Sequence, residues 1–152
     1  MTIKVDEIKK LREKTGAGIA DCRKALEEAK GDHKKAEELL KSWGIEKAAK
    51  KSQRIVSSGL VETYIHAGGK VGSMVEVNCE TDFVARTDEF KNLAHEVAMQ
   101  VAAMDPKDVE ELLKQDYIRD ASQKIEDLVK ATIAKLGENI VVKRFMRFEL
   151  GQ

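Results

Sequence analysis

Cysteine, proline and aromatic residues are scarce in this chain of 152 residues, and it contains no long apolar run. Its two cysteines, Cys22 and Cys79, lie far apart without a C-x-x-C pair, which argues against a disulfide scaffold and a cysteine-rich zinc site. No apolar stretch approaches the roughly 18 residues that cross a membrane, and the first ten residues lack the apolar segment of a signal peptide. We therefore expect reduced thiols in a cytoplasmic protein that does not associate with membranes.

Motifs of metal and nucleotide chemistry are missing as well. The three histidines fall in separate predicted elements without paired spacing, so we expect no metal site. The glycine-containing segments at residues 15–18 and 68–69 are too short for a phosphate-binding loop and are typical of turns. Cys79 could act as a nucleophile with His66 as its base, but the sequence offers no third group to orient that base. We expect no catalytic residue and no cofactor.

The charge of the chain is unevenly distributed although the formal net charge is zero. Residues 1–54 hold 15 Lys/Arg against 10 Asp/Glu, and residues 55–152 hold 12 against 17, so the two parts carry +5 and −5. The basic front part could indicate a nucleic-acid-binding module. Its basic residues are interleaved with acidic ones, however, and no array of aromatic residues is available for stacking on bases. Nucleic-acid binding is therefore the alternative function and not the favoured one.

Helical spacing of apolar residues predicts three short helices at the start of the chain. The first ends at Thr15–Gly18, where glycine can take the left-handed conformation that favours a helix end. The second runs from about Gly18 to Gly31, and Asp32 is well placed to cap the third. The apolar positions are Val5, Ile8 and Leu11, then Ile19, Cys22, Leu26 and Ala29, then Ala36, Leu39, Leu40 and Trp43. Together they predict a small three-helix bundle, which buries little apolar surface.

The run from Lys47 to Arg54 is basic and polar and predicts a junction between two modules. We place the first module at residues 1–54 and the second at residues 55–152. Two interpretations of the positive charges remain open. They can form a solvated helix end that suits the negative end of the helix dipole, or a patch that faces a partner.

The second module begins with alternating residues that predict a β-hairpin. Cys79 shares a face with the valines of the second strand, so we expect it to be buried. The strands are expected at residues 60–66, 70–79 and 140–150, and helices at residues 87–104, 108–114 and 122–136. The fold class is therefore α+β, with a small three-stranded antiparallel sheet packed against helices.

The third strand predicts an interface. Alternation places two sets of side chains on opposite faces, the apolar Ile140, Val142, Met146, Phe148 and Leu150 and the charged Lys143, Arg147 and Glu149. A sheet with helices on one side leaves the other side partly bare, and an exposed apolar patch of that size usually marks an interface. We therefore predict a symmetric homodimer in which two such sheets pack together.

One aromatic residue, Phe83, stands outside these periodic sets. It follows the second strand and precedes the helix that begins near Thr87, in a segment that should be a surface turn. A large apolar ring in such a turn is either tucked under its own loop or available to another protein. These patterns alone leave both possibilities open.

Four further segments occur in order along nearly the whole chain. They are TGAGIADCRKAL at residues 15–26, AAKK at 48–51, EVNCETDFVAR at 76–86 and GENI at 137–140. They closely resemble the corresponding segments of the bacterial elongation factor Ts family, and T-D-F-V at residues 81–84 is the most specific of them. The chain is similar to the short form of that family, in which the pairing of two chains can replace a second core half.

The resemblance implies a guanine-nucleotide exchange factor of translation elongation, which frees GDP from elongation factor Tu without being an enzyme. It implies that the N-terminal module resembles a ubiquitin-associated bundle and contacts the partner's nucleotide-binding domain through Arg12, Gly16, Ile19, Ala20 and Cys22. It also implies that an aromatic ring inserts near the partner's magnesium site, with contacts from Thr81, Asp82, Phe83 and Val84. On this interpretation the ring belongs in another protein. This chain has Ile19-Ala20 where many family members have two methionines, so the apolar contact at Ala20 is smaller.

Overall fold

The computed structural model describes residues 2–152, so residue 1 of the predicted first module lies outside the described range. The chain starts with three helices, α1 (Val5–Thr15), α2 (Ile19–Glu28) and α3 (His33–Lys51). Gly16 ends α1 in the left-handed conformation, with φ of 69°, and its N–H donates to the Arg12 carbonyl. The Asp32 carboxylate accepts from the N–H groups of Lys34 and Lys35 at the start of α3. These ends confirm the three predicted helices.

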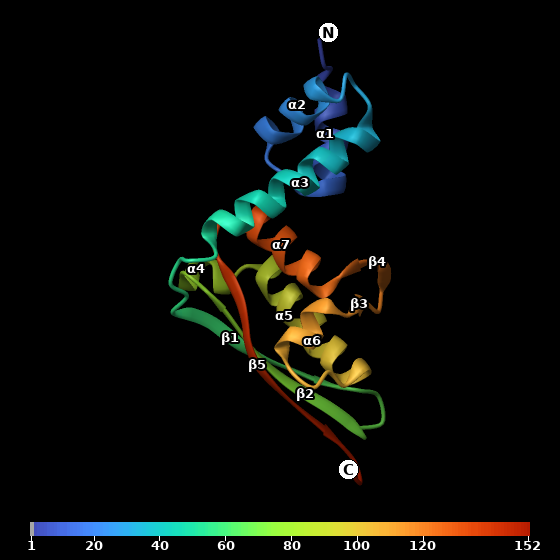
Figure 1. Cartoon of the computed structure of the whole chain (residues 1–152), viewed down its shortest axis with the longest axis vertical. Helices are drawn as coiled ribbons and strands as arrows, with labels where there is room; N and C mark the ends of the chain where they lie inside the picture. Colours follow the sequence, from blue (N-terminus) through green and yellow to red (C-terminus); the bar gives the residue numbers. More distant parts are fainter. Residues whose placement is uncertain (1) are drawn as a thin grey trace.

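The three helices enclose a small apolar core of their own, which Figure 1 places at one end of the molecule. Its fully buried members are Leu11, Cys22, Ala25, Leu26 and Ala36. Trp43 lies partly buried at its edge, with the Lys24 ammonium 4.8 Å from the ring centroid. Small residues dominate this core, so the helices approach closely although little apolar surface is buried.

α3 is longer than predicted and reaches from the bundle to the second core. It has 19 residues, of which Ala36 belongs to the bundle core and Ala48 to the larger core. Gly44 faces α7 (Ile125–Leu136) so closely that a Cβ at this position would lie 3.3 Å from the Ala134 Cβ. Residues 47–51 of the predicted junction are therefore the last part of a helix that packs against the second module. The boundary at residue 54 stays a prediction.

The larger core lies under a three-stranded antiparallel sheet, as the alternating segments predict. The strands are β1 (Ser58–Ile65), β2 (Val71–Cys79) and β5 (Ile140–Glu149), in the order β1-β2-β5. One face packs against α5 (Asp88–Met104), α6 (Val109–Lys114) and α7, and Figure 1 shows all three helices on the same side. Val75, Val77 and Cys79 are fully buried on this face. The α+β class and the buried Cys79 are confirmed.

A small hairpin was missed by the pattern. β3 (Asp116–Tyr117) pairs with β4 (Asp120–Lys124), so the predicted helix from Ser122 begins only at Ile125. The Gln100 side chain on α5 fixes this hairpin, because its Nε2 donates to the Asp116 carbonyl (3.0 Å) and its Oε1 accepts from the Ile118 N–H (3.1 Å). Strands of two and five residues give too little alternation to be recognised, and the side chain that fixes the hairpin lies 16 to 18 residues earlier, on a helix.

The predicted face of the third strand was wrong beyond residue 142. Val77 pairs with Val142 while Glu76 pairs with Arg144, so Lys143 is an extra residue in a β-bulge. The bulge reverses which side chains point inward. Arg147 therefore lies on the inner face with its side chain 15% exposed, and its Nε donates to the Ala102 carbonyl near the end of α5 (3.0 Å).

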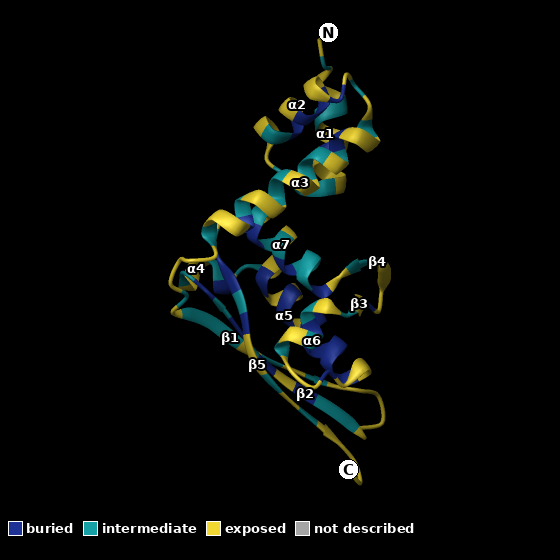
Figure 2. Cartoon of the chain, viewed as in Figure 1, coloured by how far each residue is buried: buried dark blue, intermediate teal, exposed yellow. Residues whose placement is uncertain are grey.

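The outer face of the sheet carries exposed apolar side chains. Because of the bulge, Met146 and Phe148 point outward, opposite Met74 and Gly72 of β2. The exposed apolar residues of the sheet and of the segment that follows β5 are Val61, Ile65, Met74, Met146, Phe148 and Leu150. In Figure 2 the sheet end farthest from the bundle is mostly exposed or half-buried. The apolar patch is thus real, although Ile140 and Val142 belong to the core.

Candidate functional site

Phe83 lies on a very short helix, α4 (Asp82–Ala85), that follows β2. Thr81 caps this helix, because its Oγ1 accepts from the Val84 N–H (3.4 Å). Ala85 is buried and Val84 packs partly buried against the larger core. Asp82 is exposed, and 86% of Phe83 is accessible to solvent. Of the two possibilities that the sequence left open, the ring is therefore the exposed one.

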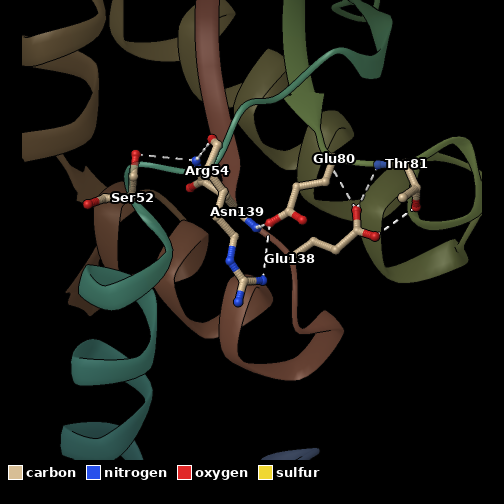
Figure 3. A network of polar contacts seen from close by, with 6 residues as sticks. All are labelled: Ser52, Arg54, Glu80, Thr81, Glu138 and Asn139. Carbon is tan, nitrogen blue, oxygen red and sulfur yellow. Dashed lines mark hydrogen bonds and ion pairs between the residues drawn. The ribbon is translucent and has the colours of Figure 1, made fainter.

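The Glu138 carboxylate holds the start of this segment from behind (Figure 3). Its Oε1 accepts from the N–H groups of Glu80 (3.1 Å) and Thr81 (3.0 Å). Its Oε2 accepts from the Thr81 hydroxyl at 2.7 Å. One side chain from the loop between α7 and β5 thus satisfies three donors that precede α4. Charge-assisted hydrogen bonds of this kind are stronger than neutral ones.

Asn139 extends the same network to the end of α3. Its backbone N–H donates to the Glu80 carboxylate (2.8 Å), and its Nδ2 donates to the Arg54 carbonyl (2.9 Å) and the Ser52 carbonyl (3.5 Å). Arg54 also pairs with Glu80, at 3.5 Å between Nη1 and Oε1. Asn139 is only 4% exposed. Three residues therefore connect the three segments, and we call these residues the clasp: Glu80, Glu138 and Asn139.

The residues predicted for the N-terminal contact lie around the turn between α1 and α2. Arg12, Ile19 and Ala20 are exposed, and Ile19 is exposed to 59%. Gly16 is half-buried, because the Lys135 side chain of α7 lies over it; a Cβ there would lie 3.2 Å from Lys135 Cε. A cavity of about 350 Å³ opens beside this turn, between α3 and α7.

Cys22 differs from the other residues of this set because it is fully buried in the bundle core. Its Sγ donates to the Ala17 carbonyl (3.7 Å), which lies in the turn itself. Burial raises the pKa of this thiol above its ordinary value. The side chain therefore supports the turn from inside the bundle.

The arrangement of Cys79 with His66 that the sequence allowed is not formed. Cys79 lies opposite Ser58 at the start of β1, whereas His66 follows the other end of that strand. Burial raises the pKa of the Cys79 thiol, and the nearby Glu138 carboxylate raises it further. The thiol donates to the Thr81 carbonyl at 3.2 Å. Its surroundings make it a structural residue behind α4.

Sequence reasoning missed Ile55, Glu138 and Asn139 as residues of this site. Ile55 is 85% exposed and follows Arg54, whose carbonyl the clasp holds. The adjacent residues 56–58 line a shallow hollow together with Asp82, which places this segment beside α4. The GENI segment carries no pattern of its own that indicates this role, because hydrogen bonds across 57–59 residues leave no periodic signal.

Within residues 2–152, no group of three or more His, Cys, Asp or Glu side chains is placed to hold a metal ion. In the same range, no helix combines the length and the apolar character needed to cross a bilayer.

Comparison with known proteins identifies the family. The family model described as "Elongation factor TS" matches residues 80–152, which include α4 and the clasp loop. A protein named elongation factor Ts from a Thermoanaerobacter species is 45% identical over 195 residues, covering 99% of this chain and 96% of that protein. The chain belongs to the elongation factor Ts family. This confirms the predicted class of function, a nucleotide exchange factor that partners elongation factor Tu in translation elongation.

Other members of the elongation factor Ts family align with different coverage. The elongation factor Ts of Herpetosiphon aurantiacus is 43% identical over 196 residues, covering 99% of both chains. That of a Nostoc species is 54% identical over 143 residues, covering 94% of this chain and 45% of that protein. The alignment with the Thermoanaerobacter protein has 195 positions and this chain has 152 residues, so at least 43 positions have no residue here. The two regions predicted to contact a partner are nevertheless both present in this chain.

Proposed function

We propose that this chain binds elongation factor Tu in its GDP-bound state and accelerates GDP release by placing Phe83 next to the magnesium and phosphate site of the partner. The observation that carries the proposal is the 86% exposed Phe83 ring on a helix that is anchored to the core behind it. A free apolar ring on an anchored support is suited to enter a pocket of another protein.

The proposed mechanism requires no covalent chemistry. Mg²⁺ bridges and neutralises the phosphate oxygens of a bound nucleotide, so displacing the residues around it weakens nucleotide binding. By thermodynamic linkage, the factor lowers the affinity for nucleotide by the same ratio by which nucleotide lowers the affinity for the factor. The chain therefore acts as an exchange factor and not as an enzyme, with no cofactor of its own.

Phe83 is not sufficient for a large effect by itself. Burial of one phenylalanine contributes roughly 1.5 to 3 kcal/mol, which corresponds to about one to two decades in an equilibrium constant. The surface around Arg12, Ile19 and Ala20 supplies further binding energy in this proposal. Because α3 is continuous from the bundle to the core, both contacts are held in one arrangement.

The exposed apolar face of the sheet supports a symmetric homodimer in which two such faces cover each other. Phe83 is not among the exposed residues of that face, so its ring stays accessible in the dimer and each protomer can bind one partner molecule. We place the protein in the cytoplasm, where translation takes place, and we expect no direct contact with nucleic acid.

The test is release of fluorescent GDP from elongation factor Tu on addition of the wild-type chain or of Phe83→Ala. The variant should release GDP about 10- to 100-fold more slowly than the wild type, with an unchanged melting temperature. Met104→Ala serves as the matched control, because Met104 is also an exposed apolar residue but ends α5. Equal rates for the Phe83 variant and the wild type would overturn the proposal. Binding to RNA with steep salt dependence would instead favour the nucleic-acid alternative.

A further inference from the structure

We propose that Glu138 is a positioning residue for nucleotide exchange, which acts by fixing the segment that presents Phe83. The inference rests on the proposed function of Phe83 and deepens it. It starts from the three hydrogen bonds that the Glu138 carboxylate accepts from Glu80 and Thr81, at 2.7–3.1 Å. These are the last residues before α4, so they determine where that helix starts and which way it points.

α4 depends on such an anchor because it is too short to be stable by itself. It has four residues, whereas isolated helices shorter than about 12 residues are marginal in water. On its exposed side, Asp82 and Phe83 face solvent. The anchors are the buried Ala85, the partly buried Val84 and the Thr81 cap. The Thr81 hydroxyl both accepts from the Val84 N–H and donates to Glu138, so the cap itself is oriented by the Glu138 carboxylate.

Asn139 gives the anchor a second connection, to the end of α3. Figure 3 shows the two neighbours pointing in different directions, Glu138 toward Thr81 and Asn139 toward Ser52 and Arg54. Asn139 also donates its N–H to the Glu80 carboxylate while the Glu80 N–H donates to Glu138. The clasp therefore fixes the Phe83 segment relative to the helix that carries the N-terminal bundle. Through it, the geometry between the two partner contacts depends on Glu138.

A double-mutant cycle tests whether Glu138 acts through Phe83. Release of fluorescent GDP from elongation factor Tu is measured with the wild type, Glu138→Ala, Phe83→Ala and the double variant. Loss of charge-assisted hydrogen bonds should make Glu138→Ala about tenfold slower than the wild type. In the Phe83→Ala background, the same change should slow release less than twofold, since the ring that Glu138 positions is already absent. An equal slowing in both backgrounds, or wild-type exchange by Glu138→Ala, overturns the inference.

Controls separate positioning from a general loss of stability. Glu110→Ala removes an exposed carboxylate from α6 and should leave exchange unchanged. Amide hydrogen exchange at Glu80 and Thr81 should become faster in Glu138→Ala but not in Phe83→Ala. Glu138→Gln retains one acceptor oxygen and should slow nucleotide exchange by an intermediate amount. This variant keeps the test valid if the alanine variant does not fold. If Glu138→Ala slowed nucleotide exchange without changing the amide protection of Glu80 and Thr81, the positioning role would be contradicted.

The cycle also distinguishes failure of the inference from failure of the proposed function. If Phe83→Ala exchanges nucleotide like the wild type, the proposed function fails and the inference falls with it. If Phe83→Ala is slow and the effect of Glu138→Ala is independent of it, only the inference is overturned.

Discussion

Met74 on β2 lies directly opposite Met146 on β5, and both side chains are exposed on the outer face of the sheet. Gly72, two residues before Met74 on β2, pairs with Ile65 of β1 on one side and with Phe148 of β5 on the other. These residues form a continuous apolar strip across all three strands. If a second copy covers the strip, each Å² of apolar area removed from water stabilises the dimer by about 25 cal/mol. The proposed homodimer therefore depends on it.

Met146→Lys should convert the dimer into monomers, because a charged side chain in the middle of the strip would be buried without a partner. Light scattering across a dilution series should give half the mass of the wild type at tens of micromolar protein. Met104→Lys is the matched control, since it places the same charge at an exposed methionine that ends α5. A wild type of monomeric mass at these concentrations would refute the dimer and leave the proposed exchange function intact.

Ile55 is an exposed apolar residue in the segment beside α4, and we predict that it makes a second apolar contact with the partner. With 85% of the residue exposed, Ile55→Ser should not change the melting temperature. Truncation of an apolar contact at an interface typically costs about 1 kcal/mol or more, so the half-saturating concentration of the factor for elongation factor Tu should rise several-fold. Binding is measured by titration, with Ile118→Ser on the β3–β4 hairpin as the control. Unaltered binding by the Ile55 variant would remove this residue from the contact.

The raised pKa of Tyr117 predicts that the free energy of unfolding falls at alkaline pH. Burial, followed by its hydrogen bond to the Glu96 carboxylate, raises the pKa of Tyr117 from 10.0 to about 12. Between these values the unfolded chain has released the phenolic proton and the folded chain still holds it, so the free energy of unfolding falls as the pH rises. The contribution is fully present below pH 10.

Chemical denaturation at pH 9 and pH 11.5 measures this loss. Tyr117→Phe should be less stable than the wild type at pH 9, because Glu96 loses a hydrogen-bond donor. It should then lose less stability between the two pH values. Tyr64→Phe, which changes the other tyrosine of the chain, is the comparison. An equal pH dependence in wild type and Tyr117→Phe would show that Tyr117 does not carry the effect.

The elements that the sequence predicted well are those with local signals. Asp32 and Thr87 cap α3 and α5 through hydrogen bonds to residues two or three positions away, and Gly16 ends α1 through its own backbone conformation. Alternation over eight to ten residues likewise revealed β1, β2 and β5. The same patterns placed Phe83 in a surface turn outside both periodicities, but only the resemblance to the family favoured an exposed ring over one tucked under its own loop.

The features that the sequence did not reveal depend on contacts between distant residues. The bulge at Lys143 follows from pairing with β2, and pure alternation through that strand misplaced Arg147. The β3–β4 hairpin is held by Gln100 on α5. Likewise, Glu138 meets Thr81 across 57 residues, so its role becomes visible only when β2 and β5 are side by side.

Gly44 determines how closely α3 can approach α7. A Cβ on this residue would lie 3.3 Å from the Ala134 Cβ, which is tighter than an ordinary contact, so we expect a larger side chain to push the helices apart. Gly44→Val should lower the free energy of unfolding by about 1–3 kcal/mol, which is typical of overpacking at a tight contact. Ser42→Val adds the same side chain to an exposed position of α3 and should cost well below 1 kcal/mol, the range set by helix propensity.

Gly44→Val should also weaken binding of elongation factor Tu, because separation of α3 from α7 moves the N-terminal bundle relative to Phe83. Ala134→Gly removes the methyl group that Gly44→Val meets, so the double variant should recover part of both the stability and the affinity. Denaturation and titration of all four proteins measure this coupling. If Gly44→Val were as costly in the Ala134→Gly background as in the wild-type background, its effect would not come from the contact between the two helices.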